Sequence, residues 1–234
     1  MLSVLPSLKR IAPETFPLPE NDAFAAGRSH PALGAAKRAT DVTVSLILLL
    51  VLSPLLLVTA LLVLAVLGWP VLFTQQRPGL GGRPFRLIKF RSMSNRCGAD
   101  GAPLPDAERL GTVGRLLRST SLDELPELVN VLRGDMSLVG PRPLLMEYLP
   151  LYSAEQRRRH DVRPGLTGLA QVGGRNALDW DAKFALDIRY VDHWSLMLDW
   201  KILAATAWQV VTRRGISHED HPTAPRFEGN RSER

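Results

Sequence analysis

The chain has 234 residues, a formal net charge of +6 and a single cysteine, Cys97. This length fits one domain, with or without a membrane element, and excludes a large multidomain machine. One cysteine cannot form an intrachain disulfide, so nothing points to an oxidising compartment. The positive net charge indicates an anionic partner, which is nucleic acid, an anionic membrane surface or a phosphorylated substrate.

Residues 1–36 are rich in proline and have little apolar periodicity, which predicts a flexible leader without a fold. A secretory signal peptide is not expected, because the apolar run that follows begins too far along the chain and is too long.

The next segment contains no charged residue between Asp41 and Arg77, and residues 42–73 are almost wholly apolar, which predicts a membrane segment over 37–76. A straight helix over 42–72 would be ~46 Å long against a hydrocarbon core of about 30 Å, so it must tilt or bend. Ser53-Pro54 predicts a kink inside the run. Basic residues flank both ends and favour a re-entrant segment with both ends in the cytoplasm, but from these residues alone a plain single span is an equally good interpretation.

From residue 77 onward the chain reads as a soluble or surface-lying domain that extends to about 217. An apolar-basic alternation over 85–91 predicts a strand, and helical patterns cover 107–118, 123–133, 145–160 and 181–193. The pattern over 195–214 carries Trp200 and Trp208 and fits a helix at a membrane interface as well as a core helix. The polar tail, 218–234, is expected to fold only against the body. The fold class is therefore mainly α with minor β.

Two adjacent carboxylates, Asp123 and Glu124, stand out in this basic chain. Ser121 and Glu124 match a capping box, which usually marks only a helix start. Pro126 favours a later start with Asp123 as the cap. Either start leaves both carboxylates at a helix N-terminus, where they stay ionised and where phosphate also binds.

Basic and polar residues near glycine and proline turns complete a candidate polyanion site. Each alone is more typical of a solvated surface, but together they suit phosphate: Lys89, Arg91, Arg118, Arg142, Arg175 and Asn176. The paired carboxylates suit Mg²⁺ shared with substrate phosphates, which makes Asp123 and Glu124 candidate metal ligands.

Several other classes lack their motifs. The chain has no P-loop and no dinucleotide-binding glycine motif opening a helix after a strand, and it has no G-x-S-x-G elbow, HExxH or CxxC pattern. Nucleic-acid binding is also disfavoured, because no zinc-finger spacing, basic zipper or RNP-type strand occurs.

Five blocks in fixed order resemble the bacterial sugar transferases known as monotopic phosphoglycosyl transferases, over about 37–217. The blocks are Ser53-Pro54 in the membrane run, "FRLIKFRSM", "LRSTSLDELPELVNVLRGDMSLVGPRPL", "RPGLTGLAQVGGRNAL" and "KFALDIRYVDHWSLMLDWKIL". The tail "GISHEDHPTAPRFEG" resembles that of the small branch of the family, which includes the enzymes that initiate bacterial protein glycosylation with N-acetylated sugars. The resemblance implies an N-acetylated sugar and leaves hexose substrates open.

The resemblance implies that sugar-1-phosphate passes from a UDP-sugar to undecaprenyl phosphate, giving the lipid diphosphosugar and UMP, as the first membrane step of glycoconjugate assembly. It implies Asp123 as the nucleophile that forms a covalent phosphosugar intermediate, and Glu124 as its partner near Mg²⁺. Lys89, Arg118 and Arg142 fall on basic positions expected to hold phosphates. Ser53-Pro54 matches the break in the family's re-entrant membrane helix, which favours re-entry over a span. The resemblance thereby implies an active site at the cytoplasmic face of the inner membrane.

Two other hypotheses remain: a membrane-anchored scaffold that binds anionic surfaces, and a lipid-phosphate phosphatase that uses the same site with water. The sequence leaves open which sugar, which polyprenol and which downstream glycan are used, and whether the chain forms a homodimer.

Overall fold

The computed structural model describes residues 31–174, 178–212 and 226–229. Within these residues the protein is mainly helical, as predicted, with two two-stranded sheets as the minor β component. The helices are α1 (Pro31–Val51), α2 (Ser53–Leu67), α3 (Asp106–Arg109), α4 (Thr112–Ser119), α5 (Glu127–Arg133), α6 (Ala154–Arg157), α7 (Leu169–Gly173), α8 (Trp180–Asp192) and α9 (Leu196–Thr212). The strands are β1 (Leu72–Pro78), β2 (Pro84–Phe90), β3 (Ser137–Val139) and β4 (Gly165–Thr167), and 3₁₀ turns lie at Leu80–Gly82, Leu122–Glu124, Met146–Leu151 and Arg158–His160.

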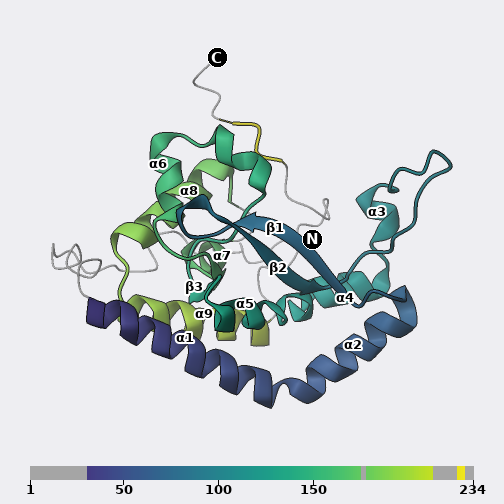
Figure 1. The fold of residues 1–234 in the computed structure, drawn as a ribbon, viewed down its shortest axis with the longest axis horizontal. Coiled ribbons are helices and arrows are strands. Elements are labelled where there is room, and N and C mark those ends of the chain that lie inside the picture. Colours follow the sequence, from purple (N-terminus) through teal and green to yellow (C-terminus); the bar gives the residue numbers. More distant parts are fainter. Residues whose placement is uncertain (1–30, 175–177, 213–225, 230–234) are drawn as a thin grey trace, which may run out of the picture.

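Helices α1 and α2 form a bent pair with a 64° bend, and the other described residues, here called the body, pack on its concave side (Figure 1). The break lies where Ser53-Pro54 predicts it. Pro54 sits in the first turn of α2, where no intrahelical donor is needed, and Ser53 Oγ donates to Leu50 O at 2.8 Å. Among the described residues no single helix is long and apolar enough to cross a membrane, whereas the bent pair taken together meets that criterion by length and composition.

Polar contacts tie both ends of the bent pair to the body. Near the start of α1, Lys37 Nζ donates to Asp199 Oδ2 at 2.6 Å, and the Arg38 guanidinium donates to two carbonyls at the end of α5 at 2.6 and 2.8 Å. At the other end, the Arg91 guanidinium donates to the carbonyls of Leu67 and Gly68, which close α2. Arg91 thus satisfies helix-end carbonyls that would otherwise lack a partner.

Helix α1 begins at Pro31, inside the segment predicted to be an unfolded leader. Residues 32–35 in its first turn are exposed, whereas Lys37 and Arg38 in the next turn bind the body through polar contacts that apolar periodicity does not reveal. The rest of the predicted leader, residues 1–30, lies outside the described residues.

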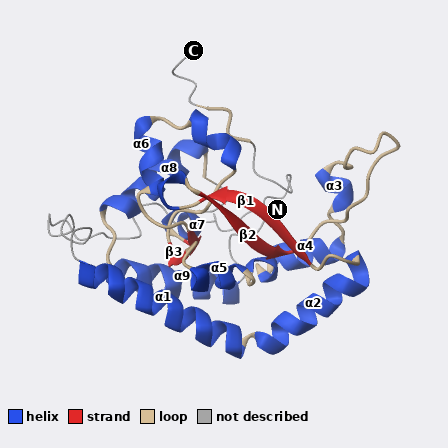
Figure 2. Ribbon diagram, in the orientation of Figure 1, coloured by secondary structure: helices blue, strands red, loops and turns tan. Residues whose placement is uncertain are grey.

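The predicted strand over 85–91 is confirmed as β2, which pairs antiparallel with β1 in a long hairpin (Figure 2). A buried side chain joins the hairpin to α5: Asn130 Oδ1 accepts from Ile88 N at 3.0 Å, and its Nδ2 donates to Arg86 O at 2.8 Å. Asn130 therefore occupies the place of a neighbouring strand and sets the position of β2 against α5.

The central core gathers apolar side chains from α5, β3, α7, α8 and α9, among them Leu128, Val131, Leu138, Leu169 and Tyr190. Helix α9 buries Leu198 and Ile202 in this core, while Trp200 and Trp208 on its outer side are 52% and 64% exposed. The core-helix interpretation of the 195–214 pattern is therefore confirmed for one face of α9. The opposite face is apolar and exposed, and its place at a membrane interface stays a prediction.

A separate aromatic cluster comprises Tyr148, Tyr152, Phe184 and Phe227, with Trp180 packed against it. Phe227 belongs to the tail and is 5% exposed. The short described part of the tail, 226–229, thus packs on the body as expected.

Three predicted helices differ from the structure. The 107–118 pattern is divided between α3 and α4, and the 123–133 pattern begins as α5 only at Glu127. The 145–160 pattern is broken into 3₁₀ turns around the short α6, because Pro150 lies inside it and cannot donate to a regular helix. The 181–193 prediction is confirmed by α8, which has its own cap: Asp179 Oδ1 accepts from Ala182 N at 2.7 Å.

Candidate active site

The acidic pair lies in the 3₁₀ turn Leu122–Glu124, between α4 and α5. Ser121 is left-handed, with φ of 57°, and its side chain makes no capping hydrogen bond, so the predicted capping box is wrong. The start at Asp123 is also wrong: Pro126 occupies the cap position of α5 and no side chain caps this helix. The carbonyls of the turn are used by the next residues, as in Glu124 N to Ser121 O at 3.2 Å, so the turn runs directly into α5.

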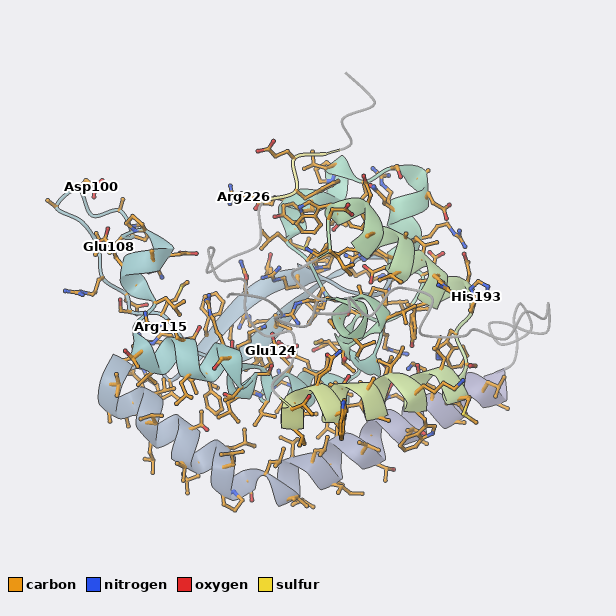
Figure 3. The ribbon with its side chains drawn as sticks, turned by 180° about the vertical axis from the view of Figure 1, so that it is seen from behind. Asp100, Glu108, Arg115, Glu124, His193 and Arg226 are labelled. Carbon is orange, nitrogen blue, oxygen red and sulfur yellow. The ribbon has the colours of Figure 1, made fainter. Side chains whose placement is uncertain are left out.

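Glu124 is held by two cations that come from distant parts of the chain. Lys89 Nζ, on β2, lies 2.9 Å from Glu124 Oε1, and the Arg142 guanidinium donates to the same oxygen. Burial alone would raise the pKa of Glu124, but the charges and hydrogen bonds of Arg142 and Lys89 outweigh it and hold this pKa well below its usual range. Glu124 is therefore ionised over the physiological pH range. It lies on the body, on the concave side of the bent pair (Figure 3).

Asp123 has a different environment although it is the next residue. It is 7% exposed, and among the described residues no hydrogen bond or ion pair engages its carboxylate. Burial, followed by the charge of Glu124, raises its pKa to about 6, against the opposing charges of Lys89, Arg118 and Arg142. The expectation that a helix N-terminus keeps this carboxylate fully ionised is therefore wrong. Asp123 is a carboxylic acid without a hydrogen-bond partner among the described residues, and it ionises near pH 6.

A third carboxylate, Glu127, escaped the sequence analysis. It is 1% exposed, and its Oε1 lies 2.9 Å from Lys89 Nζ, so one ammonium serves both Glu124 and Glu127. Burial is the main cause that raises its pKa to about 7. The available signal was spacing, because residues three apart near a helix start lie on the same side.

The structure brings three of the six predicted phosphate ligands to the acidic pair. Lys89 and Arg142 meet at Glu124, and Arg118 lies close enough to lower the pKa of Asp123 while its Nε donates to Ser92 Oγ at 3.0 Å. Arg91 is not at the acidic pair: it is 5% exposed and bound to the end of α2. Arg175 and Asn176 lie outside the described residues.

The donor set limits how a metal would bind. Within the described part of the chain, no three His, Cys, Asp or Glu side chains are grouped as a metal site. The carboxylate oxygens of Glu124 already accept hydrogen bonds from Arg142 and from Lys89, whose Nζ lies 2.9 Å from Oε1. Those of Asp123 accept no hydrogen bond from the described residues. This set fits Mg²⁺ only when substrate oxygens complete the coordination, which is the usual arrangement for Mg²⁺ on phosphates.

Comparison with known proteins bears on what this arrangement does. A family described as bacterial sugar transferase matches residues 33–213. An uncharacterized sugar transferase, EpsL of Bacillus subtilis, is 53% identical over 83% of this chain and 96% of its own length. A UDP-glucose:undecaprenyl-phosphate glucose-1-phosphate transferase of Caulobacter vibrioides is 44% identical over 77% of this chain and 72% of its own. An undecaprenyl-phosphate galactose phosphotransferase of Salmonella typhimurium is 39% identical over 76% of this chain, which spans 41% of that protein.

Proposed function

Because the chain belongs to the bacterial sugar transferase family, we propose that it transfers sugar-1-phosphate from a UDP-sugar to undecaprenyl phosphate, with release of UMP. The coarser activity, sugar-1-phosphate transfer to undecaprenyl phosphate, follows the names of its relatives. The observation that carries the site assignment is the uncommitted, buried carboxylate of Asp123 beside a Glu124 that is neutralised by Lys89 and Arg142.

In the proposed mechanism, ionised Asp123 attacks the phosphorus that carries the sugar, and the bond between the two phosphates breaks so that UMP leaves. An oxygen of undecaprenyl phosphate then attacks the same phosphorus, and the bond to Asp123 breaks. One phosphoanhydride replaces another, so catalysis rests on orientation and charge neutralisation.

The cations around the pair are suited to hold the phosphate oxygens. The Arg142 side chain is 41% exposed and has more donors than Glu124 uses, so it can meet a substrate while it binds Glu124. Arg118 is half-buried beside Asp123 and carries a second planar fork of donors. If Mg²⁺ binds, Asp123 and Glu124 would hold it together with substrate oxygens, and it would neutralise charge on the diphosphate.

The membrane arrangement is part of the same proposal. Both ends of the bent pair are tied to one body, through Lys37 and Arg38 at one end and Arg91 at the other. A body that lies on one side of a bilayer can bind both ends only if the chain enters and leaves by that side, which favours a re-entrant segment over a span. We place the body at the cytoplasmic face of the inner membrane, where a soluble nucleotide sugar and a lipid phosphate can both reach Asp123.

The test is UMP release by the purified protein from a set of UDP-sugars with undecaprenyl phosphate and Mg²⁺. The tail resemblance suggests an N-acetylated sugar, while the named relatives transfer glucose or galactose phosphate, so the set includes all three. Asp123→Asn should lower turnover on the order of 10³-fold or more and abolish any trapped sugar-phosphate adduct, because an amide is not a nucleophile for phosphorus.

Product and metal controls separate the alternatives. Substantial turnover by Asp123→Asn would remove Asp123 as the nucleophile. A phosphatase would release inorganic phosphate from undecaprenyl phosphate and need no sugar donor, and a scaffold would bind anionic vesicles without releasing UMP from any donor. Removal of Mg²⁺ by EDTA should stop UMP release, and activity that survives EDTA would contradict the shared-metal proposal.

A further inference from the structure

A buried ion pair outside the acidic site lies behind one of its cations. Arg159 and Asp187 have side chains that are only 2% and 5% exposed. The Arg159 Nη2 and Nε groups donate to Asp187 Oδ2 at 2.6 and 3.1 Å. None of the steps proposed above uses either residue.

The Arg159 guanidinium is held on all sides. It lies 5.8 Å from the Tyr152 ring centroid and 5.7 Å from that of Phe184, both in the aromatic cluster, and Nη1 donates to the Tyr152 hydroxyl at 3.4 Å. A planar cation between aromatic rings and a buried carboxylate has little freedom to change rotamer.

The same guanidinium reaches the backbone of the active site. Arg159 Nη2, besides binding Asp187, donates to Arg142 O at 2.8 Å. Arg142 stands between Pro141 and Pro143, whose fixed φ angles stiffen this loop. The next carbonyl, Pro143 O, accepts from Arg77 Nη1 at 3.5 Å. Two buried or half-buried arginines therefore hold the main chain from which the Arg142 side chain reaches Glu124.

We propose that Arg159, oriented by Asp187, is a positioning residue that holds the Arg142 main chain so that the Arg142 guanidinium meets Glu124 and the substrate phosphates; this inference rests on the proposed transferase function. The pair acts through Arg142 and touches no reacting atom. A purely structural role would predict instead that activity follows stability alone.

The experiment replaces both charges with apolar side chains of similar size, Arg159→Met/Asp187→Leu. Well-packed apolar replacements of a buried ion pair are often neutral for stability, so the thermal midpoint in detergent should stay close to that of the wild type. The kcat for UMP release should nevertheless fall roughly tenfold or more, because the Arg142 carbonyl loses its donor.

The matched control is Arg158→Gln, the adjacent residue in the same 3₁₀ turn. Arg158 pairs with Asp192 on α8, the helix that carries Asp187, but their side chains are 34% and 32% exposed and Arg158 has no contact with Arg142 among the described residues. This variant should keep the wild-type kcat.

A double-mutant cycle supplies the readout that a structural role would not move. In the Arg142→Lys background, the double replacement should add less than about threefold to the loss, because both changes act on one interaction. Should the double variant fail to fold, Arg159→Lys keeps the buried cation for Asp187 but lacks the planar fork, and the same cycle applies.

Full kcat in the folded double variant, or losses that multiply in the Arg142→Lys background, would overturn the positioning role while leaving the proposed function intact. A wild-type protein that releases no UMP from any UDP-sugar would contradict both the proposed function and the positioning role of Arg159.

Discussion

At the scale of single residues, Asp123 and Glu124 are neighbours in sequence with opposite electrostatics. Glu124 faces Lys89 and Arg142, which keep its pKa well below the usual range, whereas burial raises the pKa of Asp123 to about 6. Two titratable groups whose environments separate their pKa values are typical of sites where the groups have different roles. The difference arises because Glu124 accepts hydrogen bonds from Lys89 and Arg142, whereas the same cations act on buried Asp123 only through their charge.

His160 supplies a residue-scale prediction on pH and stability. It is 8% exposed, and burial together with the charge of Arg159 lowers its pKa to about 4 from an ordinary 6.5. The folded state therefore binds fewer protons than the unfolded state between pH 6.5 and 4. Stability from the neutral imidazole is full above pH 6.5 and is lost as pH falls through this window, by roughly 2–3 kcal/mol.

The measurement compares unfolding of the wild type and His160→Gln between pH 7.5 and 4.5. Other acidic groups titrate in the same range, so the informative quantity is the difference between the two proteins. The variant should lose less stability on acidification than the wild type, and parallel curves would contradict the assignment to His160.

At the scale of elements, α4 packs against the chain that leaves β2. A side-chain carbon at Gly114 would lie 1.9 Å from Ser92 O and 2.9 Å from Leu110 Cδ1. Gly114→Ala must therefore push α4 away from residue 92, whose side chain accepts from Arg118. We expect it to lower the free energy of unfolding by about 1–3 kcal/mol and to reduce UMP release, because Arg118 shifts relative to Asp123.

Gly111→Ala is the matched control, three residues earlier at the start of the same helix. A side-chain carbon there meets nothing within 4 Å, and the backbone is extended with φ of −74°. It should lower the free energy of unfolding by less than about 1 kcal/mol, the difference between glycine and alanine at a helix N-cap. Equal midpoints for the two variants would show that α4 is not tightly packed at residue 92.

At the scale of the whole molecule, the attachment of both ends of the bent pair to one body predicts its topology. In a Cys97→Ser background, cysteines at Ala35 and Leu80, both exposed, should react with a membrane-impermeant thiol reagent from the same side of inner-membrane vesicles. A cysteine at Leu50, next to the break and 66% exposed, should be protected from both sides because it lies in lipid. Labelling of positions 35 and 80 from opposite sides would contradict re-entry.

The same view bears on the division of the chain. The boundaries 1–36, 37–76, 77–217 and 218–234 remain a proposal. Helix α1 crosses the first boundary because it begins at Pro31, and Phe227 of the tail packs into the aromatic cluster of the body. The bent pair, the body and residues 226–229 of the tail are thus parts of one packed unit.

The sequence by itself determined what local chemistry controls. The uncharged apolar run, the break at Ser53-Pro54, the strand β2 and the helix α8 follow from hydropathy, proline stereochemistry and capping, which act within a few residues. The acidic pair was visible for the same reason, because its two members are adjacent.

Only the tertiary structure decided how these residues work together. Lys89 reaches Glu124 across 35 positions and also meets Glu127, and Arg91, which the sequence assigns to phosphate, instead closes α2. Burial of Asp123, which sets its pKa, depends on elements that pack around it from elsewhere in the chain. Desolvation and charge pairing are summed over neighbours in space, and hydrophobic periodicity along the chain carries no record of which distant cation lies beside which carboxylate.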